Sequence, residues 1–273
     1  MKTADSGFYK LLRPEQVGPL RFCGQSLPLD SPAIFGGQLL AQVLSAAAAT
    51  LLQPRAAHYL QMSFLAFGDP EAVLDFDVAI VRDGRTTSHR NVLVTQSSKT
   101  LLSASVSFQD NMEGLSHALA MPDVSDPEQL LEHSTNEILL SANQDTPFPF
   151  RIINCACANE RSPESRVWAI AREPAPADAL LQQMLFAFFS DATILQSALQ
   201  PHQLDWQSPG LAIATMNHTI WFHRSINVND WILLHSLSPS TGGGRALSTA
   251  NAFSRSGSLL ASVAQEGILR SPA

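Results

Sequence analysis

An acidic side chain lies inside one of the most apolar stretches of the sequence. Asp191 follows Phe188 and Phe189 and precedes Ile194 and Leu195. A carboxylate in such surroundings is costly unless it has polar partners. Partial loss of its water makes a carboxylate a stronger base, which suits it to take a proton from water. A structural aspartate bonded to a core hydroxyl fits the same position, so the residues alone leave both interpretations open.

Two further polar residues are candidates for the same site. Period-two alternation places Gln265 on one strand face with Leu259, Ala261 and Val263. A buried amide needs hydrogen-bond partners, which either a bound water with a carboxylate or a nearby backbone group would supply. Thr215 lies in a strand-like stretch, and its hydroxyl can hold water as donor or acceptor. Both faces of that stretch are mixed, so its pattern does not predict which way Thr215 points.

Two apolar helices are expected to position these residues. The first is expected from Gly36 to about Leu52, where Pro54 stops it, and the second from about Asp178 to Leu199. Both are apolar on nearly all sides, which indicates buried helices rather than surface helices.

A similar series of strands follows each helix. In the first half, strand-like segments at 76–80, 92–96 and 101–109 are joined by turns, with a hairpin turn at 82–85. In the second half, segments at 220–222, 231–234, 246–253 and 259–269 follow the same order, with a glycine turn at 242–244. The offset of roughly 155 residues indicates a duplicated α+β unit.

The expected fold is therefore α+β, with two tandem units in which an antiparallel sheet wraps a central buried helix. This is the hot-dog layout, and two copies in one chain pair the sheet edge that one copy would leave open. We expect an N-terminal unit at 1–112, a linker at 113–164 and a C-terminal unit at 165–273. Asp126 and Pro127 predict one short helix in the linker, as cap and first residue.

Composition excludes several functions. The net charge is −7 and no cluster of Lys and Arg occurs, so no nucleic-acid partner is expected. No apolar run is long enough for a membrane span, and no secretory signal is apparent at the N-terminus. Cys23, Cys155 and Cys157 suggest neither a disulfide framework nor a zinc site, and we expect no metal and a cytoplasmic location.

Short motifs lie along both halves in a fixed order. They are Phe-Gly-Gly-Gln at 35–38, Val-Arg-Asp-Gly at 81–84, residues 104–109, Ser-Asp at 190–191, Ala-Thr at 214–215, His218, Trp-Phe-His-Arg at 221–224, Asp-Trp at 230–231 and residues 261–267. In these motifs the chain resembles the acyl-CoA thioesterase II family over most of its length. The resemblance implies a double hot-dog fold and hydrolysis of acyl-CoA thioesters, without a cofactor. The triple glycine at 242–244 and Asn217 depart from the family pattern, which puts the substrate pocket and the assembly interface in doubt.

The resemblance also implies roles for individual residues. Asp191, Thr215 and Gln265 match the family's Asp, Thr and Gln around the attacking water, and His58 matches a position near its active-site region.

Other expectations concern the substrate and the assembly. Backbone N–H groups around Gly37 and Gln38 are candidates for stabilising the oxyanion. Arg82 is a candidate for binding the CoA phosphates. We expect acyl-CoA as substrate and a homodimer or larger homo-oligomer.

Two alternatives remain at this stage. One is a hot-dog hydratase, whose chemistry needs a His paired with an acid, and the Asp-x-Asn-x-x-His pattern is absent from the sequence. The other is a non-catalytic acyl-CoA-binding protein on the same scaffold, against which the presence of Asp191, Thr215 and Gln265 argues.

Overall fold

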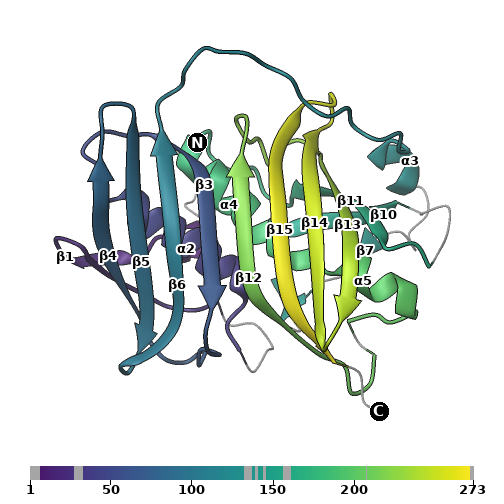
Figure 1. Ribbon diagram of the computed structural model, residues 1–273, viewed down its shortest axis with the longest axis horizontal. Coiled ribbons are helices and arrows are strands. Elements are labelled where there is room, and N and C mark those ends of the chain that lie inside the picture. The colour runs from purple at the N-terminus through teal and green to yellow at the C-terminus, as the bar shows by residue number, and fades with distance from the viewer. Residues whose placement is uncertain are drawn as a thin grey trace.

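A single large sheet organises the protein. The computed structural model describes residues 7–27, 33–131, 137–138, 141–143, 146–155, 161–206 and 208–270. Within these residues, thirteen strands pair in the order β1-β2-β4-β5-β6-β3-β12-β15-β14-β13-β11-β10-β7 (Figure 1). The strands are β1 Glu15–Gly18, β2 Arg21–Gly24, β3 Ala56–Phe64, β4 Leu74–Asp83, β5 Thr87–Gln96, β6 Lys99–Gln109, β7 Glu137–Ile138, β10 Phe150–Cys155, β11 Glu164–Ala171, β12 Ala212–Phe222, β13 Ile232–Gly242, β14 Arg245–Ser254 and β15 Leu259–Arg270, while β8 Ser141–Asn143 and β9 Thr146–Pro147 form a separate pair.

The sheet joins two equivalent halves at its centre. Each half runs from a long helix into four antiparallel strands, β3 to β6 in the first half and β12 to β15 in the second. β3 and β12 pair antiparallel, with Gln61 opposite Thr219, so each half covers the open edge of the other. The predicted tandem hot-dog fold is confirmed.

Two buried helices lie side by side behind the sheet (Figure 1). They are α2 Gly36–Ala48 and α4 Ala179–Thr193, and the short helices are α1 Gly7–Leu11, α3 Pro127–Leu131, α5 Gln196–Leu199 and a 3-10 turn at Gln200–His202. Leu40 and Leu44 of α2 and Phe186 and Phe188 of α4 have no exposed surface. Because both helices are enclosed by the sheet and by each other, almost every side of each is apolar.

Both helices end earlier than the sequence pattern predicts. The amides of Thr50 and Leu51 bond to carbonyls three residues back, so the chain leaves α2 in a tight turn ahead of Pro54. The second helix is interrupted at Ile194 and Leu195, whose side chains are buried, and α5 continues after the break. The expected single helix to Leu199 is therefore two helices.

The chain crosses between the halves over one end of the sheet (Figure 1). Residues 110–126 are extended and lead to α3. The Asp126 carboxylate accepts a hydrogen bond from the Glu128 amide at 3.2 Å, which confirms the predicted cap of this helix. Trp168 Nε1 donates to the carbonyl of Ser125 at 3.1 Å, so the end of the crossover packs on the second half. The segment expected as linker also contains β10, which pairs with β11 in the sheet. The division at 112 and 164 stays a prediction, and Cys157 lies outside the described residues.

Two tight turns agree with the sequence. Gly84 N–H donates to the Thr87 carbonyl at 2.8 Å between β4 and β5. Gly243 and Gly244 join β13 to β14 with φ of +58° and +74°, which glycine adopts without strain. No helix in the described part of the chain is long and apolar enough to cross a bilayer.

Candidate active site

The carboxylate of Asp191 lies near the C-terminal end of α4. Asp178 begins this helix, and its side chain accepts a hydrogen bond from the Leu181 amide at 2.7 Å. Asp191 comes three turns later and is 8% exposed, which leaves part of its carboxylate accessible. The phenylalanines before it are fully buried, so α4 holds the acid at the edge of the apolar core.

Asp191, Thr215 and Gln265 form a closed triangle of hydrogen bonds. Thr215 Oγ1 lies 3.1 Å from Asp191 Oδ1, and Gln265 Nε2 lies 2.9 Å from the same oxygen. Gln265 Nε2 also lies 2.8 Å from Thr215 Oγ1. The three predicted residues thus come together from one helix and two neighbouring strands, and they satisfy the buried carboxylate and amide.

A β-bulge orients Thr215. The register between β12 and β15 shifts between Thr215 and Asn217, so Met216 is the extra residue. Residues 218, 220 and 222 point into the core, and regular alternation would turn Thr215 outward. The extra residue reverses the parity, which places Thr215 and His218 on the same face. Gln265 shares the inward face of β15 with Ala261 and Val263, as the alternation predicts. The prediction is wrong for Leu259, which packs with Phe253 in a separate cluster, because the register of β15 shifts between Leu259 and Ala261.

His218 and Ser190 adjoin the triangle. His218 Nδ1 lies 2.8 Å from Gln265 Oε1, and its Nε2 lies 3.0 Å from Ser190 Oγ. The ring has no exposed surface, and burial lowers the pKa of His218, while Asp191 and Gln265 act to raise it. The sequence offered only weak signals here: the Ser-Asp pair at 190–191 and the place of His218 in a motif.

The start of α2 lies against Asp191 from the other half. A β-carbon added to Gly36 would lie only 2.6 Å from Asp191 Oδ2, and one added to Gly37 would overlap the carbonyl oxygen of Phe188. Both positions therefore require glycine, since α2 and α4 approach too closely for a side chain. The Gly-Gly pair of the sequence is the contact between the two central helices.

Gln38 is engaged within the fold. Its backbone N–H donates to the carbonyl of Phe35 at 3.1 Å, and its side chain contacts Leu27, Gln25 and Gln42. These bonds anchor the segment before α2, so neither its amide nor its side chain is directed at Asp191.

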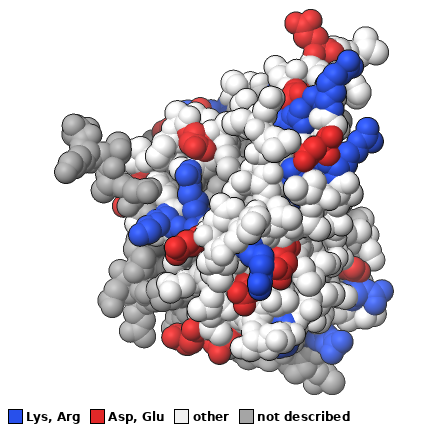
Figure 2. All heavy atoms as spheres, turned by 90° about the vertical axis from the view of Figure 1, so that its left-hand side faces the viewer, with Lys and Arg blue, Asp and Glu red and all other residues white. Residues whose placement is uncertain are grey.

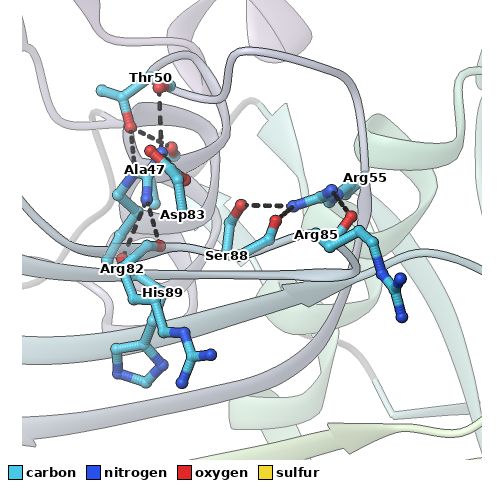
Figure 3. Close-up of polar contacts among 10 residues, drawn as sticks. Ala47, Thr50, Arg55, Arg82, Asp83, Arg85, Ser88 and His89 are labelled. Atoms are coloured by element: carbon cyan, nitrogen blue, oxygen red, sulfur yellow. Dashed lines mark hydrogen bonds and ion pairs between the residues drawn. The ribbon is translucent and has the colours of Figure 1, made fainter.

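Arg82 lies at the far end of α2 from Asp191. It belongs to the β4–β5 hairpin, which the buried Arg90 ties to Thr50 just past the end of α2 (Figure 3). The length of α2 separates this cluster from Gly36 by about 20 Å at 1.5 Å per residue. Arg82 contributes its carbonyl to the cluster and its side chain is exposed. On the side of the molecule that carries β1 and β4, at the left of Figure 1, basic and acidic groups are intermixed (Figure 2).

His58 also lies away from the triangle. Its Nε2 bonds Ser107 Oγ at 2.8 Å on the sheet face turned away from the helices, near the start of β3. The opposite end of β3, at Phe64, is the end that adjoins Gly36. The roles of His58 and Arg82 in binding substrate stay predictions. In the described part of the chain, no group of three or more His, Cys, Asp or Glu side chains is placed to hold a metal ion.

The tandem arrangement of helix and strands makes the chain a double hot-dog protein. Its Asp, Thr and Gln triangle lies where the two central helices meet. The sequence profile of the acyl-CoA thioesterase family matches residues 149–268, and that of the acyl-CoA thioesterase N-terminal domain matches residues 27–109. The chain belongs to the acyl-CoA thioesterase II family and is a thioester hydrolase that acts on acyl-CoA.

Individual relatives match nearly end to end. Acyl-CoA thioesterase 2 of Haemophilus influenzae is 34% identical over 278 residues, covering 95% of this chain and 96% of the relative. Acyl-coenzyme A thioesterase 8 of Mus musculus is 30% identical, over 88% of this chain and 81% of the relative. The crystal structure of an acyl-CoA thioesterase II from Mycobacterium marinum superposes with a TM-score of 0.82 at 30% identity, covering 97% of this chain and 98% of that chain. These relatives favour thioester hydrolysis over hydration and over acyl-CoA binding without catalysis.

Proposed function

We propose that Asp191, Thr215 and Gln265 together hold the attacking water and that Asp191 removes its proton. The triangle of hydrogen bonds among the three side chains is the observation that supports this. All of its bonds to Asp191 fall on Oδ1, and the described residues give Oδ2 no hydrogen bond. Oδ2 is therefore the oxygen that takes the proton, while Thr215 and Gln265 fix the carboxylate and orient the water.

The reaction then proceeds by direct attack. The water oxygen bonds to the thioester carbonyl carbon as its proton passes to Asp191, giving a tetrahedral oxyanion. Collapse of this intermediate breaks the carbon–sulfur bond, and the CoA thiolate takes the proton back from Asp191. The products are a carboxylic acid and CoA, and Asp191 returns to its starting state.

The start of α2 suits the stabilisation of the oxyanion. First-turn amides have no acceptor within their own helix, and a helix N-terminus favours negative charge. Gly36 lies beside Asp191 Oδ2, so a carbonyl attacked there meets this turn. We assign the donor role to the Gly37 amide, because the Gln38 amide is already donated to Phe35. The first half would thus supply the oxyanion donor and the second half the base.

The decisive experiment replaces the base. Asp191→Asn keeps the size of the side chain and removes the proton acceptor, so kcat for thiol release from acyl-CoA should fall roughly 10²–10⁴-fold. Asp178→Asn is the matched control on the same helix, since asparagine also caps helices, and its kcat should stay within about twofold. A folded Asp191→Asn variant with full turnover contradicts the assignment. Assaying a series of acyl chain lengths with a thiol reagent then tests the proposed fatty acyl-CoA substrates.

We further propose that copies of the chain associate through the outer face of the sheet. Across β4 to β14 this face carries many small or uncharged side chains, such as Ser103, Ser105 and Ala264, together with the partly exposed apolar residues Leu93 and Trp221. Exposed aromatic residues such as Trp221 are enriched at protein interfaces, and association would cover exposed apolar residues such as Leu93. Sedimentation should give a homodimer or larger species, and a strict monomer contradicts this. We also place the enzyme in the cytoplasm, with the free thiol of Cys23 in support, which cell fractionation tests.

A further inference from the structure

His218 joins two parts of the site without being exposed to substrate. Its ring has no exposed surface, and its Nδ1 lies 3.8 Å from Asp191 Oδ1. It contacts Gln265 through one nitrogen and Ser190, the neighbour of Asp191, through the other. His218 is also directly opposite Gln265 in the pairing of β12 with β15, so the strand register holds the two side chains together.

The contacts of Gln265 fix the direction of its amide. Its Nε2 faces both Asp191 Oδ1 and Thr215 Oγ1, at 2.9 Å and 2.8 Å. Its Oε1 consequently faces His218, and an amide oxygen can only accept a hydrogen bond. His218 Nδ1 must therefore carry a proton. If the amide were reversed, its oxygen would face the carboxylate, and Asp191 would lose a donor.

Ser190 completes the arrangement at the other nitrogen. Burial keeps the pKa of His218 below its ordinary value, so the ring is neutral near pH 7 and has one N–H. With Nδ1 protonated, Nε2 is an acceptor, and the Ser190 hydroxyl at 3.0 Å is a donor. The same hydroxyl hydrogen can also reach the Ala187 carbonyl at 2.9 Å. A hydroxyl has one hydrogen and can also accept, so Ser190 is compatible with the tautomer that Gln265 requires but does not select it, and the choice rests with Gln265.

We propose that His218 is a positioning residue for hydrolysis: its Nδ1–H holds the Gln265 amide in the orientation that presents Nε2 to Asp191 and Thr215. This inference rests on the proposed role of Gln265. An amide without a fixed partner at its oxygen has two orientations of similar shape, and only one supports the carboxylate. His218 selects that one, and it does not contact the reacting atoms.

The test compares two replacements of His218. His218→Asn places a side-chain NH₂ near the position of Nδ1 and keeps a donor for Gln265, whereas His218→Leu fills the space without one. Buried groups that orient the ligands of metal sites are worth roughly 10–100-fold in activity, and we expect His218→Leu to lower kcat by a similar factor with KM nearly unchanged. His218→Asn should recover most of this loss. The matched control is His223→Leu, since His223 is exposed and bonds Ser262 away from the triangle.

A double-mutant cycle separates this role from simple packing. In a Gln265→Ala background, His218→Leu should cause little further loss, because the group that it positions is gone. Equal kcat for the Asn and Leu variants, or fully multiplicative losses in the cycle, overturns the proposal. Gln265→Ala alone tests the proposed function: if it keeps full turnover, the role of Gln265 fails, whatever His218 does.

A measurement on the unaltered protein covers the case in which His218→Leu does not fold. The ¹⁵N chemical shifts of the His218 ring report which nitrogen carries the proton. We expect the Nδ1–H tautomer at pH 7 to 8. An Nε2–H tautomer there overturns the proposal, since Gln265 Oε1 would then have no donor from the ring.

Discussion

Gly36 of the first half and Asp191 of the second are in direct contact: a β-carbon on Gly36 would lie 2.6 Å from Asp191 Oδ2. The contact joins the start of α2 to the end of α4. The base from one half therefore lies next to backbone amides from the other, and neither half holds the complete site. This relationship leads to two predictions that distinguish the two adjacent glycines.

Gly36→Ala should impair catalysis. The new methyl group would lie against Asp191 Oδ2 and, at 3.2 Å, the ring of Phe64, so the carboxylate must shift from the position in which Thr215 and Gln265 bond it. A displacement of about 1 Å at a reacting group can cost about 10²-fold, and we expect kcat to fall by about that factor. Gly114→Ala is the control, because a β-carbon there has no neighbour within 4 Å. Unchanged kcat in Gly36→Ala would show that Asp191 tolerates the shift.

Gly37→Ala should instead destabilise the fold. Its methyl group would overlap the backbone carbonyl of Phe188, which cannot rotate aside as a side chain can. The two helices must separate, and such overpacking costs about 1–3 kcal/mol of unfolding free energy. Urea unfolding measures it, with Gly242→Ala as a control in open space. An unfolding free energy equal to that of the control would mean that α2 and α4 are not packed this closely.

The sequence predicted the elements well because their patterns are local. The apolar runs predicted α2 and α4, and the alternation of Ala261 and Val263 predicted the inward direction of Gln265, although Leu259 lies across a register shift and packs elsewhere. The repeated order of helix and strands predicted the tandem arrangement. The break in the second helix was not predicted, because both sides of it are equally apolar and no glycine or proline marks it.

The site itself depends on contacts that no local pattern contains. Thr215 faces the core because Met216 forms a bulge, and nothing in a strand-like run distinguishes a bulged residue from a regular one. The partnership of His218 with Gln265 follows from strand register across 47 positions. The contact of Gly36 with Asp191 depends on how the two halves pack. These relationships come from tertiary structure, so the sequence could supply the residue types and not their geometry.

Asp83→Asn should lower stability without affecting turnover. Arg90 is fully buried and its guanidinium pairs with Asp83 at 2.8 Å. Burial alone would raise the pKa of Asp83. Hydrogen bonds from Arg90 and Ser88 outweigh this and hold the pKa of Asp83 below its ordinary value. Asp83 is partly exposed, so we expect a loss of about 2 kcal/mol, below the figure for a fully buried pair.

The control for this change is a pair on the surface. Asp77→Asn breaks the exposed contact of Asp77 with Arg21, which should cost less than about 1 kcal/mol. Chemical unfolding of both variants gives the comparison, and kcat should be that of the wild type in each. A drop in kcat for Asp83→Asn would mean that the hairpin is coupled to the site at the other end of α2.

The last prediction concerns pH and stability. Burial lowers the pKa of His218 in the folded protein below its ordinary value of 6.5. As the pH falls through 6.5, the unfolded chain binds a proton that the folded chain does not, so the unfolding free energy decreases. Above that pH both states are neutral and the effect is absent. His218→Asn should therefore reduce the loss of stability between about pH 7.5 and 5.5, measured by urea unfolding. His58 and His223, whose pKa values burial also lowers, are present in both proteins, so the difference isolates His218. Identical pH profiles would show that His218 binds a proton equally well in the folded and unfolded chain, which contradicts the lowering of its pKa by burial.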